Sequence, residues 1–337
     1  MVALRKVAHA SLVVGARGDR QNAMKPCVDT TSRQTSLRKS VTLSGRGAHS
    51  DAPARLTLSP AEAGTGVVFV ARDADRPIAA HWTNVSSTRL RTEISRGAAR
   101  VSTIEHLMAA FAGIGVDNAL VEIDESEVPA MDGSAGPFVA AIRAAGVKRL
   151  AATRRVIKIV EPVRVSDGAG WAEFAPTNHS RLDLDVEIAF DGAIGRQRLA
   201  LSLASRIFAR ELASARSFGF VQDAERLWRQ GLALGASLDN CVIFDGDRVL
   251  NPQGLRYADE MARHKMLDAI GDLALAGAPI HGAFRSYRGG HGLNLALIER
   301  LMTTPSAFTL IGDAGSPAQG VRRGEAGAVG RGLGLSP

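Results

Sequence analysis

Apolar and polar residues alternate along the first part of the chain in short runs that predict β-strands: SVTLSG, ARLTLSP and GVVFV. These runs precede an almost wholly apolar stretch, STIEHLMAAFAG, at 102–113. Its large apolar residues recur at helical spacing and form one stripe: Ile104, Leu107, Met108 and Phe111. The other positions are also apolar or small, apart from Glu105 and His106. We therefore expect a helix that is buried on both sides, between two layers.

The order helix, strand, loop, helix occurs twice along the chain. The first helix is followed by DNALVEI, a polar loop and PFVAAIRAAG. In the second half, the strands VIKIVEPVRV, WAEFA and LDLDVEIAF precede the helix YADEMARHKMLDAIGDLALAG, which is followed by IHGAFRSY, a glycine loop and LNLALIERLM. This repetition predicts an α+β fold with two similar domains, at 35–150 and 151–305, each a β-sheet packed on helices.

The two ends of the chain differ from this body. Residues 1–34 show no sustained periodicity and are expected to form a disordered extension. Residues 306–337 become rich in glycine, alanine and arginine, and we expect a flexible tail. No apolar run approaches the roughly 20 residues of a membrane span, so stable membrane insertion is not expected.

Charge and cysteine content narrow the choice of function. The formal charge of +7 comes mostly from arginines that are scattered rather than clustered with aromatic residues, so a nucleic-acid partner is not favoured. A few of these arginines are enough to bind a small anionic partner such as a diphosphate. Cys27 and Cys241 lie far apart and form no CxxC pair, which is typical of a reducing compartment and indicates a cytoplasmic protein.

Glu105 and His106 are the first candidate functional residues. Ser102 is a suitable N-cap, and Glu105 then occupies the N3 position of a capping box, which is the simpler interpretation of this residue. A lone histidine in such a helix is more often a hydrogen-bonded core residue than a ligand. However, a helix N-terminus stabilises the neighbouring anion and disfavours the imidazolium, leaving a neutral ring that can bind metal. The pair therefore also suits a base beside a metal ligand.

The second long helix carries His264 and Asp268 four residues apart on one face. The opposite side is an apolar stripe of Met266, Leu267, Ile270 and Leu273, and Gly271 leaves room near the polar face. An exposed ion pair, which stabilises a helix by roughly 0.2–0.5 kcal/mol, is the simpler interpretation. Asp272 adds a like charge four residues after Asp268, and a nearby cation is needed to offset their repulsion. This crowding favours a functional site.

These two helices together offer His106, His264 and Asp268, and three protein ligands with an open position are typical of catalytic zinc. The spacing alone is a weak signal, because the ligands come from distant segments. The loop RGGHG contains His291, where glycines give the backbone close access to a ligand, although a flexible turn with an exposed histidine is the simpler interpretation. Asp272 is able to accept a hydrogen bond from His291 and keep it protonated, as a general acid or oxyanion stabiliser requires.

Five segments follow one another in the chain: SxxEHLxAAxxGxGxDN at 102–118, PxMDGSA at 129–135, SFGF at 217–220, RHKMLDAIGDL at 263–273 and SYRGGHGLN at 286–294. Together with SGRGAHS at 44–50, they resemble the UDP-3-O-acyl-N-acetylglucosamine deacetylases of lipid A biosynthesis. The resemblance covers about residues 34–303. It implies a metal-dependent hydrolase that uses zinc, with iron as the alternative, and we expect the protein to be a monomer. This enzyme removes acetate from the N-acetyl group of UDP-3-O-(3-hydroxyacyl)-N-acetylglucosamine.

The resemblance also implies that the two helix layers face each other across the active site, and it assigns roles to residues. The metal ligands are His106, His264 and Asp268. The catalytic residues are Glu105 as general base, His291 oriented by Asp272, and Ser217, which stands where the family commonly has threonine and keeps a hydroxyl for the oxyanion. The substrate-binding residues are Lys265, His49, Phe218 and Phe220.

Family members carry an insert in each domain, here at 72–94 and about 221–257. The second insert is expected to form a passage for the acyl chain, with Phe218, Phe220, Leu227 and Trp228 as lining residues. Ordinary core packing is the alternative for each of them. The family often has an aromatic residue near the uridine site after WAEFAPTN. This chain has His179 and Ser180 there, so the sequence does not identify the nucleotide contacts in that region.

Two other functions remain open at this point. One is a metal amidohydrolase that acts on another acylated sugar. The other is an inactive sugar-nucleotide binding protein, against which the complete set of Glu105, His106, His264, Asp268 and His291 argues. Neither cysteine lies in a motif suited to a nucleophile, so direct hydrolysis without a covalent intermediate is expected.

Overall fold

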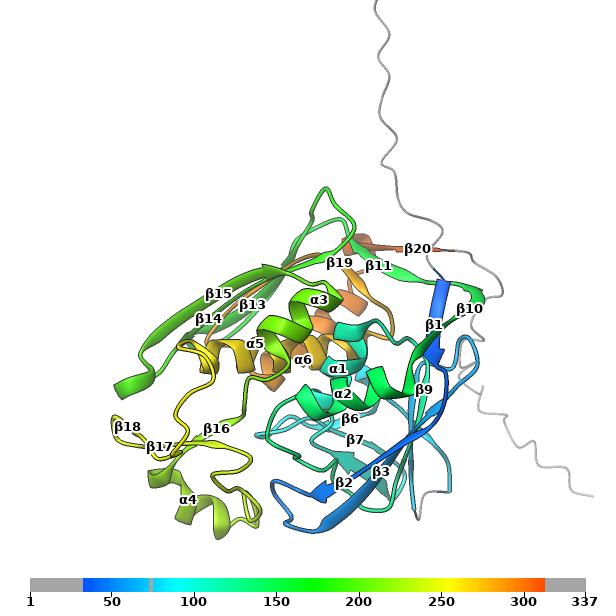
Figure 1. The fold of residues 1–337 in the computed structure, drawn as a ribbon. Helices are drawn as coiled ribbons and strands as arrows, with labels where there is room; N and C mark the ends of the chain where they lie inside the picture. The colour runs from blue at the N-terminus through cyan, green and yellow to red at the C-terminus, as the bar shows by residue number, and fades with distance from the viewer. Residues whose placement is uncertain (1–32, 73–74, 313–337) are drawn as a thin grey trace, which may run out of the picture.

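The computed structural model describes residues 33–72 and 75–312. Two large β-sheets enclose a set of helices, so the fold is α+β as predicted (Figure 1). None of the helices in these ranges combines the length and apolar composition needed to cross a bilayer.

The five-stranded sheet has the strand order β2-β3-β9-β4-β5. Its strands are β2 (Val41–Arg46), β3 (Pro53–Pro60), β4 (Val67–Ala71), β5 (Ile78–Ala79) and β9 (Ala119–Ile123). β4 and β9 are parallel, and the other neighbours are antiparallel. Along β3 the apolar residues Ala54, Leu56 and Leu58 are buried, whereas Arg55, between the first two, is exposed. This alternation produces one core-facing side, as the sequence pattern predicts.

The seven-stranded sheet is built around β19 (Ile280–Tyr287), which pairs antiparallel with β13 and parallel with β14 and β11. The other strands are β11 (Val156–Ile159), β12 (Val163–Asp167), β13 (Gly170–Ala175), β14 (Leu182–Ala189), β15 (Arg196–Ser202) and β20 (Phe308–Ile311). The run VIKIVEPVRV, predicted as one strand, forms two, β11 and β12. Pro162 lies between them and cannot donate a hydrogen bond to a ladder, which explains the break.

Three smaller sheets complete the β structure. β1 (Arg33–Leu37) pairs antiparallel with β10 (Val147–Thr153). A second sheet contains β6 (Val85–Ser87), β7 (Glu93–Arg96) and β8 (Ala99–Ser102), and a third contains β16 (Phe218–Phe220), β17 (Val242–Asp245) and β18 (Arg248–Val249). The second and third sheets fall within or beside the segments expected to be inserts.

The α-helices are α1 (Glu105–Ile114), α2 (Gly136–Ala145), α3 (Ser205–Ile207), α4 (Val221–Trp228), α5 (Glu260–Leu273) and α6 (His291–Met302). Short helical turns are η1 (Trp82–Asn84), η2 (Gly192–Ile194), η3 (Phe208–Leu212), η4 (Ala274–Ala276) and η5 (Pro305–Ala307). α6 begins two residues earlier than the predicted helix, which places His291 at its N-terminus.

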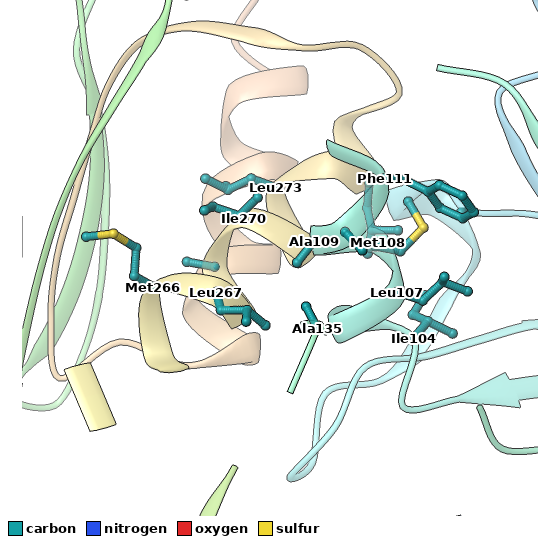
Figure 2. Close-up of a cluster of buried hydrophobic side chains, with 14 of the residues drawn as sticks. Ile104, Leu107, Met108, Ala109, Phe111, Ala135, Met266, Leu267, Ile270 and Leu273 are labelled. Carbon is teal, nitrogen blue, oxygen red and sulfur yellow. The ribbon is translucent and has the colours of Figure 1, made fainter. Parts of the chain in front are cut away.

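α1, α2, α5 and α6 lie between the two large sheets (Figure 1). α2 contacts β2 of the five-stranded sheet, whereas α5 contacts β14 and β15, and α6 contacts β12 and β13. α1 packs against both α2 and α5 and is buried almost throughout, as its composition predicts. In Figure 2 the large side chains of α1, such as Phe111, point away from α5, and Met266 lies on the far side of α5. The small Ala109 lies between the two helices.

The prediction of a flexible tail at 306–337 is wrong at its start, because the ordered fold continues past residue 306. Residues 308–311 form β20, which pairs antiparallel with β11 from Val156↔Ile311 to Ile159↔Phe308 and so completes an edge of the large sheet. Likewise, Arg33 and Gln34 of the expected extension at 1–34 belong to β1. The rest of both expected segments, 1–32 and 313–337, lies outside the described residues.

Candidate active site

The chain enters α1 through a sharp turn from β8. Thr103 adopts a left-handed backbone with φ of 58°, and the helix begins at Glu105 without a side-chain cap. Ser102 is the last residue of β8, and its hydroxyl donates to the carbonyl of Ser126 (3.2 Å). The predicted capping box is therefore wrong, because Ser102 is still a strand residue and Glu105 is the first helical residue rather than the fourth of a box.

Three side chains from α1 and α5 converge on one point. His106 Nε2 lies 3.5 Å from Asp268 Oδ1, and His264 Nε2 lies 3.3 Å from the same oxygen. The two imidazoles stand edge to face, with ring centroids 4.9 Å apart. The ligand atoms of all three residues lie within 4.8 Å of one another, and all three residues are buried. The exposed ion pair considered for His264 and Asp268 is therefore wrong.

The hydrogen bonding of this group suits a divalent cation. Asp268 Oδ1 is buried and has no hydrogen-bond partner among the described residues, although it points at two imidazole nitrogens. His264 Nδ1 lies 3.1 Å from the carbonyl of Ala215 and donates to it, which leaves Nε2 as the unprotonated, ligating nitrogen. Two imidazoles and a carboxylate are a common donor set for zinc and for iron.

The electrostatics of the three residues differ. Burial lowers the pKa of His264 to about 4, so this ring is neutral at pH 7. Burial alone opposes ionisation of Asp268, but His264, Lys265 and His106 hold its pKa well below the ordinary value. Burial also lowers the pKa of His106, yet Asp268 and Glu105 outweigh it and the pKa is raised. The pKa of His106 is therefore not lowered by its place near the helix N-terminus, contrary to the expectation, and a metal ion competes with a proton for this ring.

Glu105 faces the same space from the first turn of α1. It is 3% exposed, and its Oε2 accepts a hydrogen bond from the backbone N–H of Thr92 (3.0 Å). Burial raises its pKa, and the nearby His291 and His106 partly offset this effect. A carboxylate with a raised pKa is a better proton acceptor than an exposed one, which suits a general base.

His291 occupies the N-terminus of α6, after the glycine loop. Its Nδ1 donates to Asp272 Oδ2 (2.8 Å), the contact predicted from the sequence. Burial opposes protonation of the ring, but Asp272 raises its pKa to about 9. Asn294 Nδ2 donates to the same carboxylate oxygen (2.8 Å), and Thr92 Oγ1 donates to Asp272 Oδ1 (2.6 Å). His291 is therefore a cation at neutral pH and is held by a fully hydrogen-bonded carboxylate.

Lys265 contacts this group directly, and Ser217 lies in the chain between Ala215 and Phe218, which both contact His264. Lys265 Nζ donates to Asp268 Oδ2 (2.7 Å), and Asp268 raises the pKa of this lysine although burial opposes it. Lys265 thus contacts Asp268 through the carboxylate oxygen that does not face the two imidazoles. Ser217 is fixed through its backbone: its N–H donates to Gly133 O (2.8 Å), and its carbonyl accepts from Val242 N (2.7 Å). Both bonds use the backbone of Ser217, so its hydroxyl is not needed to hold this segment in place.

His49 lies in the loop between β2 and β3, which Glu127 holds in place. Glu127 accepts hydrogen bonds from the N–H groups of His49 (2.9 Å) and Ser50 (2.8 Å) and from the hydroxyl of Thr103 (3.0 Å). Burial, together with Arg91, lowers the pKa of His49 to about 4. Its Nδ1 accepts from Ala233 N (3.2 Å), so this neutral ring connects the loop to the segment 221–257.

Aromatic side chains continue from the metal group toward that segment. The ring of Phe218 lies 6.3 Å from that of His264, and Phe218, Phe220 and Phe190 contact one another at 5.5–6.4 Å between centroids. Phe190, which directly follows β14, is 38% exposed, so the cluster reaches the surface. Phe190 did not stand out in the sequence. Trp228 is 56% exposed, so it is not the core residue considered as the alternative.

Two other features lie apart from this chemistry. A cavity of about 530 Å³ at the C-terminal ends of α1 and α5 is lined by Phe111, Ile270 and His281 among others, and none of the candidate metal ligands borders it. Cys241 is a buried free thiol, and burial raises its pKa to about 12, so it is a poor nucleophile, as expected.

The structure adds three residues to the site that sequence reasoning missed: Thr92, Asn294 and the carbonyl of Ala215. Asn294 lies within the segment SYRGGHGLN, so the sequence marks its position, but it does not indicate that Asp272 is its hydrogen-bond partner. Thr92 lies in the expected insert at 72–94, where no periodicity or motif marks it. A backbone carbonyl carries no sequence signal at all.

Comparisons with known proteins show which family this chain resembles. The family of UDP-3-O-acyl N-acetylglycosamine deacetylases matches residues 34–303. Relatives described as UDP-3-O-acyl-N-acetylglucosamine deacetylase, from Brucella ovis, Brucella canis and Brucella melitensis biotype 2, are 46% identical over 281 residues. Each alignment covers 82% of this chain and 98% of the relative. All candidate site residues lie within the matched range.

Proposed function

Because the chain belongs to the UDP-3-O-acyl N-acetylglycosamine deacetylase family, we propose that it hydrolyses the N-acetyl group of UDP-3-O-(3-hydroxyacyl)-N-acetylglucosamine. The products are acetate and the free amine, and the reaction is the committed step of lipid A biosynthesis. The observation that carries this proposal is the convergence of His106, His264 and Asp268 beside Glu105 and His291.

The metal ligands in this proposal are His106, His264 and Asp268, and the unpaired Oδ1 of Asp268 is the main support for them. The metal is zinc, with iron as the alternative for the same donors. When bound, the ion supplies Lewis acidity and lowers the pKa of a coordinated water toward neutrality.

The proton transfers in the proposed reaction belong to two residues of this chain. Glu105, with its raised pKa, removes a proton from the attacking water. His291, held as a cation by Asp272, faces the charge that develops on the acetamide oxygen and then donates a proton to the leaving amine. The hydroxyl of Ser217 also donates to the oxyanion. The amine then leaves without a covalent intermediate.

Substrate binding follows from the groups around this centre. Lys265 and His49 are proposed to contact polar parts of the UDP-sugar, and Phe218 and Phe220 to contact the acyl chain. The continuous aromatic contacts from His264 through Phe218 toward the exposed Phe190 support this direction for the chain.

The domain organisation and setting are also proposals. Domains at 35–150 and 151–305 are supported by the repeated order α1-β9-α2 and α5-β19-α6 and by the parallel pairing of each repeated strand with an earlier one. The candidate site lies where α1 of the first meets α5 of the second. We place the protein in the cytoplasm, because its two cysteines suggest no disulfide framework. We also propose that it acts as a monomer.

Metal analysis combined with an acetate-release assay tests the function. We expect the purified protein to hold one equivalent of zinc or iron per chain and to release acetate from the UDP-acyl-sugar. UDP-N-acetylglucosamine without the acyl chain is expected to react poorly. Equal turnover of both sugars points to an amidohydrolase of another specificity, and a protein without metal and without acetate release points to an inactive binding protein.

A further inference from the structure

The N–H, the hydroxyl and the carbonyl of Thr92 all form hydrogen bonds at the candidate site. Its N–H donates to Glu105 Oε2 (3.0 Å), its hydroxyl donates to Asp272 Oδ1 (2.6 Å), and its carbonyl accepts from the N–H of Ile104 (3.4 Å). The residue is 2% exposed. It thus joins the start of α1 to the last turn of α5.

These contacts place Thr92 between the two groups that exchange protons in the proposed reaction. On one side it binds the carboxylate of Glu105. On the other it binds Asp272, which in turn binds His291. We infer that Thr92 is a positioning residue that fixes Glu105 and His291 relative to each other, a role that rests on the proposed function.

The hydroxyl of Thr92 has a specific task within this arrangement. Asp272 Oδ2 already accepts from His291 and Asn294, and the hydroxyl is the donor to Oδ1. With both oxygens engaged, the carboxylate plane cannot rotate, and Oδ2 stays directed at His291. Removing the hydroxyl leaves a buried anionic oxygen without its donor, and the carboxylate then turns to find another one.

The backbone around Thr92 is shaped to deliver these contacts. Leu90, two residues earlier, adopts a left-handed conformation with φ of 61°, which is unusual for a branched residue. The residue after Thr92, Glu93, pairs with Ser102 at the end of β8. Because Ser102 leads directly into α1, the strand pairing sets the position of Thr92 against that helix. The unfavourable backbone conformation of Leu90 is maintained because the surrounding contacts fix the geometry of this segment.

A purely structural clamp is the alternative, and Thr35 provides a matched control for it. Thr35 also binds a carboxylate: its N–H donates to Asp117 Oδ2 (2.9 Å), and its hydroxyl lies 3.1 Å from the same oxygen and 2.5 Å from the carbonyl oxygen of Gly115. It lies on β1, outside the candidate site. Thr35→Val therefore removes a hydroxyl that contacts a carboxylate and a backbone carbonyl, at a place where no chemistry is proposed.

The test compares Thr92→Val, Thr92→Ser and Thr35→Val with the parent enzyme, each loaded with zinc and assayed for acetate release from the UDP-acyl-sugar. We expect Thr92→Val to lower kcat by about 10- to 100-fold, with metal content and KM unchanged. Thr92→Ser keeps the hydroxyl and is expected to retain most of kcat. Thr35→Val is expected to melt at a lower temperature but to keep the parent kcat.

Each result decides between the roles. A Thr92→Val enzyme with the parent kcat, or a Thr92→Ser enzyme as impaired as Thr92→Val, overturns the positioning role. So does a loss that appears in KM alone. If Thr92→Val does not fold, Thr92→Ala and Thr92→Ser carry the same comparison, because their difference also isolates the hydroxyl. A parent enzyme that releases no acetate contradicts the proposed function instead, so the two failures are distinguishable.

Discussion

Gly271 of α5 lies directly against the backbone of Glu105 on α1. A Cβ atom placed on Gly271 would stand 2.0 Å from the carbonyl oxygen of Glu105 and 3.0 Å from its Cα. No side chain fits in this contact, and the obstacle is backbone rather than a flexible side chain. The closeness of the two helices, and hence the geometry of the candidate site, therefore depends on a missing methyl group.

Gly271→Ala is expected to impair both activity and stability. The added methyl forces α1 away from α5, which separates Glu105 and His106 from Asp268 and destabilises the fold by roughly 1–3 kcal/mol. Melting temperature and kcat/KM report the two effects. Gly292→Ala is the control for stability, since a Cβ there would be 3.5 Å from only the Thr88 hydroxyl and alanine favours a helix. An active, stable Gly271→Ala protein contradicts the close contact.

Glu105→Ala and Glu105→Gln are expected to keep the metal and lose most of the activity. Neither substitution removes a proposed ligand, but both remove the proton acceptor, so kcat falls by about 100-fold or more. Metal content by elemental analysis and acetate release by single-turnover assay give the two readouts. Near-parent turnover in either variant excludes Glu105 as the base, and loss of metal indicates that it belongs to the ligand set.

The sequence predicts most of the strands and helices because their apolar periodicity is local information. It also brings out Glu105, His106, His264, Asp268 and His291, because ionisable groups stand out in apolar or glycine-rich surroundings. The capping box fails for the opposite reason: the pattern from Ser102 to Glu105 is local, but the pairing of β8 with β7 decides where the helix begins.

Other parts of the site depend on contacts between distant segments, which local patterns do not report. Thr92 lies 180 residues from Asp272 along the chain, and its loop has no periodic signal. Arg216 is fully buried, whereas an arginine in a sequence is ordinarily expected at the surface. In both cases the partner, not the residue itself, determines the role.

The activity of this protein is expected to fall at high pH through deprotonation of His291. Asp272 raises the pKa of this imidazole to about 9, and the proposed mechanism needs its cationic form. Activity is therefore retained below that value and lost as the pH rises through it. Asp272→Asn removes the main stabilising charge, so the basic limb of kcat/KM against pH moves to lower pH. An unshifted limb shows that a different group controls it.

Removal of the metal is expected to abolish activity and lower the melting temperature. A ligand that binds only the folded state at 100 times its Kd stabilises that state by about 2.7 kcal/mol, so added zinc raises the melting temperature of the chelated protein. Asp268→Ala is expected to lose this response. His81→Ala, which alters a histidine outside the metal group, is expected to keep it. Zinc-dependent stabilisation of Asp268→Ala equal to that of the parent contradicts the assigned ligands.

The buried ion pair Arg216–Glu260 is expected to govern stability around the site. Arg216 Nε and Nη2 donate to the two oxygens of Glu260 at 2.8 and 3.0 Å, and both residues are fully buried. Burial alone disfavours the Glu260 carboxylate, but Arg216 and two backbone N–H groups hold its pKa below the ordinary value. The stability from this lowered pKa is present above the unfolded-state pKa of Glu260 and is lost as the pH falls through the folded-state value.

Glu260→Ala leaves the guanidinium buried without its partner and is expected to destabilise the protein by about 3–5 kcal/mol in urea unfolding at pH 7. The double variant Arg216→Met with Glu260→Leu removes both charges and is expected to recover much of that loss. Because Arg216 precedes Ser217 and Glu260 is the first residue of α5, the single variant also displaces the segment that presents His264. A single variant as stable as the parent would show that the pair contributes no net stability. A double variant no more stable than Glu260→Ala would instead assign the loss to packing.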